Sequence, residues 1–148
     1  MSFKDIIGLF KLGKATAKSH MRNLIEIAAA DGNLAIEEQR LLEYAAQRNN
    51  ISTLQLKDIQ ADASKVRFEV PGNEEEKFFQ LYDLVQMMTV DKNIHGEELR
   101  LCEIFAIKFG YRKEIVREMI ELIRENIDKW IGPKETMQTI MRAMKVYD

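Results

Sequence analysis

Hydrophobic side chains along this chain recur at intervals of three and four residues, the spacing of one helical face. The pattern predicts helices over residues 15–30, 35–49, 52–64, 73–90, 95–109 and 112–131, and a last helix that begins at Pro133. Ser52 and Gln55 are typical of a helix N-terminus, in which each side chain caps a backbone N–H group. Residues 66–72 alternate like a short extended segment that connects two helices. We therefore expect an all-α fold, a compact helical bundle with short connections.

The first residues of the chain carry a short amphipathic pattern. Phe3, Ile6, Ile7 and Phe10 share one face of a predicted helix over residues 3–12, and lysines occupy the other positions. One interpretation is that this basic helix packs on the body of the domain. The other is that it contacts the inner membrane, since an apolar face bordered by lysines suits an anionic lipid surface. The contact residues would be Phe3, Lys4, Ile7, Phe10, Lys11 and Lys14.

One stretch of the sequence occurs twice. Residues 31–38 begin Asp-Gly-Asn and end Glu-Glu, and residues 91–98 repeat this acidic pattern sixty positions later without a gap. The match extends into the flanking helices, where Leu24 corresponds to Leu84 and Ala46 to Ala106. Such a repeat predicts an internal pseudo-duplication, with two units of helix, acidic loop, helix and helix over about residues 20–64 and 80–124.

Each repeat places one glutamate on the inward face of a helix. Glu38 falls among Leu41, Leu42 and Ala45 on the helical wheel, and Glu98 has the matching position in the second repeat. Burying a carboxylate is costly unless it is compensated. The compensation can come from a capping box, in which each glutamate accepts a hydrogen bond from the N–H group three residues earlier. An inward arginine is a second possibility.

The third possibility is a metal site. If the two repeats pack about a pseudo-twofold axis, the acidic loops come together, and a cation can be shared by Asp31, Glu38, Asp91 and Glu98. A set of oxygen ligands favours a hard divalent cation, Ca²⁺ or Mg²⁺. The loops are not EF-hands, because Ile36 stands where that loop requires glycine.

Length and composition limit the classes of protein that remain. At 148 residues with a net charge of −2, the chain is expected to form a single domain, residues 1–148, with no general attraction to nucleic acid. The single cysteine, Cys102, excludes an intrachain disulfide and is expected to be a core thiol. No signal peptide or membrane-spanning segment is apparent, so we expect a cytoplasmic protein, with membrane association through its first residues.

Motifs for catalysis are absent from the sequence. No nucleophile motif, phosphate-binding glycine loop or histidine cluster occurs, so we expect no enzymatic activity. The single tryptophan, Trp130, stands just before Gly132 and is expected to anchor the end of a helix.

The repeated motif resembles that of the TerB-like family. The shared residues are Ala29, Ala30, Asp31 and Gly32, with Leu34 and Glu38, repeated as Asp91, Ile94 and Glu98. That family includes a tellurite-resistance protein and the N-terminal domain of a membrane-anchored DnaJ-like co-chaperone. The resemblance implies an all-helical, pseudo-duplicated domain in a cytoplasmic stress or metal response, with Asp31, Glu38, Asp91 and Glu98 as cation ligands.

These observations lead to two expectations for function. The first is a non-enzymatic TerB-like domain in a tellurite-resistance-like system that binds a divalent cation and a protein partner. The alternative is a metal-free scaffold that docks on a protein partner or on the membrane.

Overall fold

The computed structural model describes residues 14–30, 32, 34–90 and 96–147, and this part of the chain is all helical. Its α-helices are α2 (Lys14–Ala29), α3 (Ile36–Arg48), α4 (Thr53–Ala61), α5 (Glu74–Thr89), α6 (Gly96–Lys108), α7 (Lys113–Asp128) and α8 (Pro133–Ala143). A single 3₁₀ turn, η1 (Ala63–Lys65), follows α4. The described residues contain no strand, so the predicted all-α class is confirmed.

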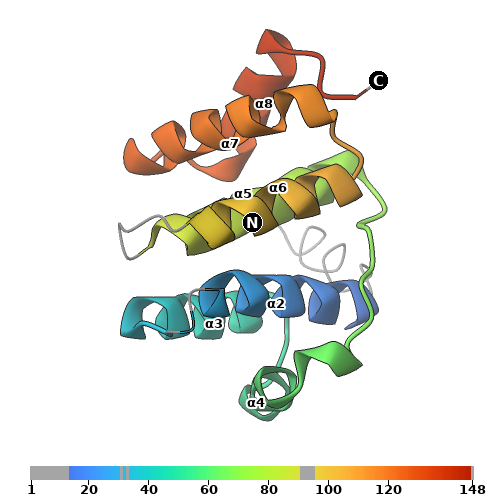
Figure 1. Cartoon of the computed structure of the whole chain (residues 1–148), viewed down its shortest axis with the longest axis vertical. Coiled ribbons are helices and arrows are strands. Elements are labelled where there is room, and N and C mark those ends of the chain that lie inside the picture. The colour runs from blue at the N-terminus through green and yellow to red at the C-terminus, as the bar shows by residue number, and fades with distance from the viewer. Residues whose placement is uncertain (1–13, 31, 33, 91–95, 148) are drawn as a thin grey trace, which may run out of the picture.

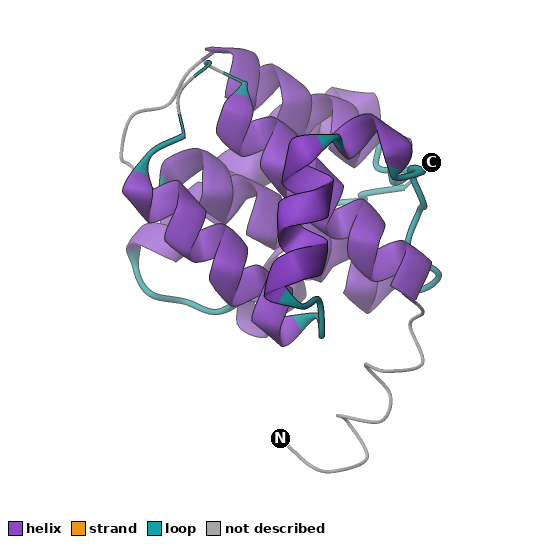
Figure 2. Ribbon diagram, turned by 90° about the horizontal axis from the view of Figure 1, so that it is seen from below, coloured by secondary structure: helices purple, strands orange, loops and turns teal. Residues whose placement is uncertain are grey.

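The helices lie in successive layers. Helices α2 and α3 form one layer, α5 and α6 the next, and α7 and α8 the third, with α4 on the outer side of the first (Figure 1). The first and second layers meet mainly where α2 packs on α5, and α2 also contacts α6. The view from below shows the helices closing around one interior (Figure 2).

That interior is one continuous hydrophobic core. Its largest fully buried side chains are Phe78, Phe109, Met21, Leu24, Ile27, Leu42, Leu81, Leu84, Met87, Met88, Met119 and Ile120. Most of them belong to α2 and α5, whose positions match the predicted apolar stripes. Cys102 is also fully buried, as predicted.

Helix boundaries recur at the sixty-residue interval seen in the sequence. Helices α2 and α5 have the same length and sit sixty residues apart, as do α3 and α6, and α4 and α7 begin sixty residues apart. The helix ends match too, since Asn50 after α3 and Gly110 after α6 both have positive φ. The internal pseudo-duplication itself stays a prediction from the sequence.

The ends of two helices differ from the prediction. The helix expected over residues 52–64 ends at Ala61, and Asp62 then caps the 3₁₀ turn by accepting a hydrogen bond from the Ser64 N–H group. Helix α7 ends at Asp128, three residues earlier than expected. There the N–H groups of Trp130 and Ile131 bond back to the carbonyls of Ile127 and Asn126, which closes the helix.

The prediction for Trp130 is wrong. Its side chain is 95 % exposed, so it anchors nothing in the bundle. Its backbone φ is 61°, in the left-handed region, and at this turn after α7 the ring lies in solvent.

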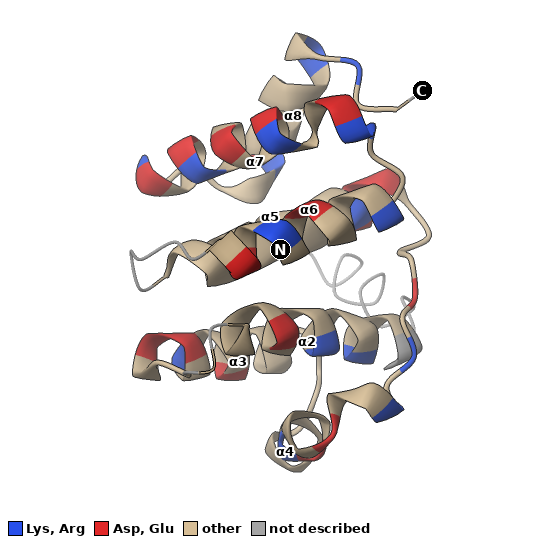
Figure 3. Cartoon of the chain, viewed as in Figure 1, with Lys and Arg blue, Asp and Glu red and all other residues tan. Residues whose placement is uncertain are grey.

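Charged side chains of both signs cover the outer surface. Figure 3 shows basic and acidic residues alternating along α7. Arg124 pairs with Glu121 within α7 at 2.8 Å, and Arg117 pairs with Glu103 of α6 at 3.0 Å. The mixture agrees with the near-neutral net charge.

Candidate functional site

Glu38 lies in the first turn of α3 and is 1 % exposed, as the helical wheel predicted. Its Oε1 accepts a hydrogen bond from the Ala35 N–H group at 3.0 Å. This bond is one half of a capping box. The other half is missing because the alanine side chain has no acceptor to offer the helix.

Glu98 has the matching position in the first turn of α6. It is also 1 % exposed, and Cys102, one turn later, is completely buried. Burial is the main reason that the pKa of the Cys102 thiol is strongly raised, and the negative charges of Glu98 and Glu103 add to it. Cys102 is therefore a protonated core thiol, and its Sγ–H donates to the Leu84 carbonyl at 3.6 Å.

The two glutamates begin helices that start at the same end of the bundle. Helices α2 and α5 both end there and α3 and α6 both begin there, at the left of Figure 1. The described helix ends on either side of the two acidic segments therefore lie at one end of the bundle, and the pseudo-twofold packing stays a prediction. The loop between α7 and α8 reaches this end as well.

The other two predicted ligands, Asp31 and Asp91, lie outside the described residues. Within the described residues, no group of three or more His, Cys, Asp or Glu side chains is placed to hold a metal ion. The glutamates nevertheless suit a hard cation chemically. A carboxylate has two oxygens that accept, so a backbone bond to one of them leaves it able to ligate.

A buried polar network lies at the contact of α2 with α5, and the sequence does not predict it. His20 of α2 is 2 % exposed, and its Nε2 lies 2.9 Å from Oδ2 of Asp83 in α5. The same oxygen accepts a bond from Nη2 of Arg48, at the end of α3, at 2.7 Å. One carboxylate thus joins three helices. No sequence pattern identifies it, because the three residues are far apart in the chain.

The electrostatics of Asp83 follow from these contacts. Burial by itself would raise the pKa of this carboxyl. The hydrogen bond from His20, the electrostatic attraction of His20 and Arg48, and the hydrogen bond from Arg48 outweigh burial, so the pKa of Asp83 lies below its ordinary value. Asp83 is therefore held as a carboxylate.

Two amide side chains border this network, one on each helix. Asn23 is completely buried, and neither of its amide atoms has a hydrogen-bond partner among the described residues. Gln80 is 3 % exposed, and its Nε2 donates to Glu76 while its Oε1 has no partner in the same part of the chain. Asn23 and Asp83, like His20 and Gln80, are sixty residues apart.

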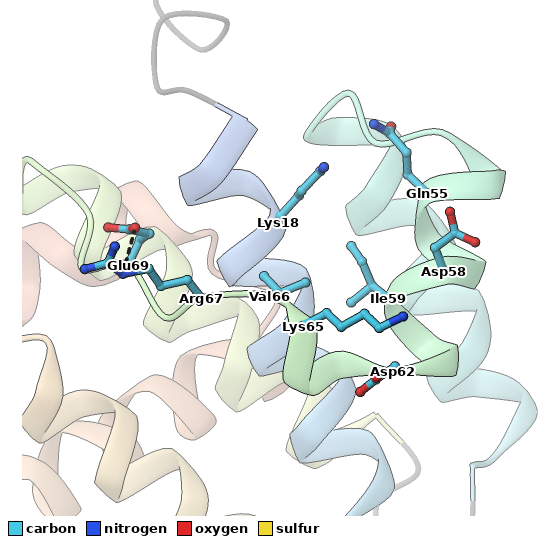
Figure 4. Close-up of a pocket in the computed structure, with 9 residues that line it drawn as sticks. All are labelled: Lys18, Gln55, Asp58, Ile59, Asp62, Lys65, Val66, Arg67 and Glu69. Atoms are coloured by element: carbon cyan, nitrogen blue, oxygen red, sulfur yellow. Dashed lines mark ion pairs between the residues drawn. The ribbon is translucent and has the colours of Figure 1, made fainter.

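A surface pocket of about 480 Å³ lies between α2, α4 and the connector that follows α4. Ile59 and Val66 are its two apolar lining residues, and Figure 4 shows them between the charged side chains. Its sides carry charges of both signs: Lys18, Lys65, Arg67, Asp58, Asp62 and Glu69. Among them, Arg67 and Glu69 pair at 3.8 Å. The lining is therefore mostly polar, and of its two apolar residues Ile59 is only 5 % exposed.

Most of the predicted membrane-contact residues lie outside the described part of the chain. Of the six, only Lys14 is within it, as the first residue of α2. Among the described residues, no helix has both the length and the apolar character needed to cross a bilayer.

No family model, curated protein or solved structure matches this chain.

Proposed function

We propose that this chain is a non-enzymatic TerB-like helical domain that binds a divalent cation, Ca²⁺ or Mg²⁺, in a cytoplasmic stress or metal response. The observation that carries the proposal is the matched pair Glu38 and Glu98. Both are 1 % exposed, both stand in the first turn of a helix, and the two helices begin at one end of the bundle.

The physical argument rests on the cost of burial. A buried carboxylate is costly unless it is compensated, and the N-terminal helix dipole and, at Glu38, the hydrogen bond from Ala35 supply part of that compensation. A cation between the loops would add direct charge compensation for both glutamates. Asp31 and Asp91, which begin the same loops in the sequence, would complete an oxygen ligand set.

Titration calorimetry with Ca²⁺ and Mg²⁺ tests this proposal on the whole chain. Binding is expected, and the melting temperature should rise with ion concentration, because the cation binds only the folded state. Replacing both glutamates, E38Q with E98Q, should abolish both responses while the protein stays folded. A matched control is E37Q with E97Q, since Glu37 and Glu97 are the exposed neighbours in the same two first turns.

The alternative is a metal-free scaffold that binds a protein partner, and one contact favours it. The bond from the Ala35 N–H group to Glu38 compensates that carboxylate without a metal. In this case neither cation shifts the melting temperature. E38Q then changes little, because glutamine can accept the same bond, whereas E38A lowers the free energy of unfolding by about 1 kcal/mol. A flat titration with that mutational pattern would exclude the cation site.

A further inference from the structure

We propose that the joint between α2 and α5 contains an internal hydration site, in which a buried water molecule links the side chains of His20, Asn23 and Gln80. The inference goes beyond the proposed function and does not depend on a bound cation. It rests on polar atoms that are buried at this joint and that no group in the described part of the chain satisfies.

All three side chains are buried. Asn23 is completely covered, His20 is 2 % exposed and Gln80 is 3 % exposed. Four of their polar atoms have no hydrogen-bond partner among the described residues: Nδ1 of His20, Nδ2 and Oδ1 of Asn23, and Oε1 of Gln80. A buried polar group without a partner is destabilising, because it has given up its hydrogen bonds to solvent.

The register of the two helices brings these side chains together. Helices α2 and α5 have the same length, lie sixty residues apart in the sequence and end at the same end of the bundle (Figure 1). His20 on α2 contacts Asp83 on α5, and Asp83 occupies the position that corresponds to Asn23. The reciprocal contact of two such parallel helices joins Asn23 to Gln80, which corresponds to His20. We therefore expect the two amides to face each other beside the bond between His20 and Asp83.

Hydrogen bonds at the edges of the site determine which atoms face it. Nε2 of Gln80 donates to Oε1 of Glu76 at 3.1 Å, which turns the amide oxygen of Gln80 the other way. Nε2 of His20 lies 2.9 Å from the Asp83 carboxylate, which only accepts, so this nitrogen is the donor. In the neutral imidazole, the remaining Nδ1 is then an acceptor.

The unsatisfied atoms are short of donors. Three of them accept hydrogen bonds, on His20, Asn23 and Gln80, whereas the Asn23 amide nitrogen alone donates. A direct bond between the two amides would satisfy the Gln80 oxygen and leave the other two acceptors buried without a donor. A water molecule corrects this imbalance, because it donates two hydrogen bonds and accepts from the Asn23 amide. About three protein partners are usual for an internal water.

The site lies where the two halves of the bundle meet, since α2 packs on α5 there. Its partners are at most 3 % exposed, so the water can exchange with solvent only when the two helices move apart. The residence time of this water would therefore report how often the joint opens.

Magnetic relaxation dispersion of water oxygen-17, in solutions of the full chain, tests the proposal because it counts the waters that exchange slowly with bulk solvent. The test variant is N23L/Q80M, in which each amide becomes an apolar side chain of similar shape. It should hold one slowly exchanging water fewer than the native chain. The matched control is Q47M, which makes the same change at an exposed position of α3 and should leave the count unchanged.

Urea denaturation of the single variants is a second measurement. N23L and Q80M each remove one partner of the water and leave the other amide poorly satisfied, so each should lower the folding equilibrium constant about tenfold. The double variant should lose less than the two single effects combined, because replacing both partners by apolar groups of the same shape is much less costly.

An unchanged number of slowly exchanging waters in N23L/Q80M would overturn the proposal, whether the amides bond directly to each other or remain unpaired. Single variants that each stabilise the protein, with additive effects, would overturn it as well, because they would reveal two separate unpaired amides. If N23L/Q80M does not fold, the native chain still decides the question. A nuclear Overhauser contact between water and the side-chain amide of Asn23 is then expected, and its absence would exclude the site. The outcome of the cation titration leaves all of these results unchanged.

Discussion

Trp130, the second residue after α7, adopts a backbone conformation that its side chain disfavours. Three helices, α3, α6 and α7, end in the same pair of backbone hydrogen bonds, with one residue in the left-handed region. That residue is Asn50 after α3, Gly110 after α6 and Trp130 after α7. Asparagine and glycine suit this conformation, whereas tryptophan does not. Since Trp130 buries almost nothing, it gains no packing energy in return.

Replacing Trp130 by glycine should therefore stabilise the protein. The left-handed conformation costs an ordinary residue about 1 kcal/mol, and W130G is expected to raise the free energy of unfolding by about that amount. Chemical denaturation measures it. The control is W130A, which removes the ring but keeps the cost, and it should match the native chain. A W130A protein less stable than the native chain would show that the ring makes a stabilising contact, and a W130G protein no more stable than W130A would show that the left-handed conformation costs nothing here.

At the scale of the elements, the joint between α2 and α5 combines an apolar core with one ionised network. Leu24 and Leu84 are buried there beside the Asp83 carboxylate, which binds His20 of α2 and Arg48 of α3. The network fixes the register of three helices, because a shift of any one of them would leave a buried charge without its partner.

The stability that Asp83 supplies should depend on pH. Its folded pKa is lower than the unfolded value of about 3.9, so the contribution is complete above that pH and is lost as pH falls through the folded pKa. Replacing the carboxylate, D83N, should lower the free energy of unfolding by about 2 kcal/mol at neutral pH. The difference from the native chain should shrink as the solution is acidified below about pH 4.

Urea denaturation at a series of pH values measures this difference. The control is E26Q, since Glu26 pairs with Arg22 at 3.1 Å on the surface of α2 and should contribute less than about 1 kcal/mol. A D83N effect that is the same size in acid and at neutral pH would mean that the charge of Asp83 is not what stabilises the joint.

Across the whole molecule, the interior is continuous from α2 to α8. The two halves share the α2–α5 contact, and neither buries its apolar face without the other. Such a core is expected to unfold as one cooperative unit.

Thiol protection tests this cooperativity. Cys102 is buried in the second half, and Leu42, sixty residues earlier, is equally buried in the first. The native chain and the L42C/C102S variant each present one buried thiol. In each protein, thiol labelling should give the same opening free energy as global unfolding measured by circular dichroism. Labelling in one half at a much lower free energy than global unfolding would show that this half opens by itself.

The sequence predicts the helices of this fold well because their stripes are long and their boundaries carry local signals. The glutamates Glu38 and Glu98 were also placed correctly, since a helical wheel determines which face a first-turn residue occupies. Contacts between residues far apart in the chain have no such local signal in the sequence. The bond between His20 and Asp83 joins positions 63 residues apart, and the pocket depends on how the connector crosses α4. The exposure of Trp130 also escaped prediction, because it follows from one backbone angle at the end of α7.

The position of Trp130 has a practical consequence for spectroscopy. It is the single tryptophan of the chain, and its ring is surrounded by solvent in the folded state. Its emission should therefore already resemble that of an unfolded peptide, and denaturation should change the colour of the fluorescence very little. The same indole is well suited to detect association. A partner that covers the loop between α7 and α8 would shift the emission to the blue and shield the ring from an aqueous quencher.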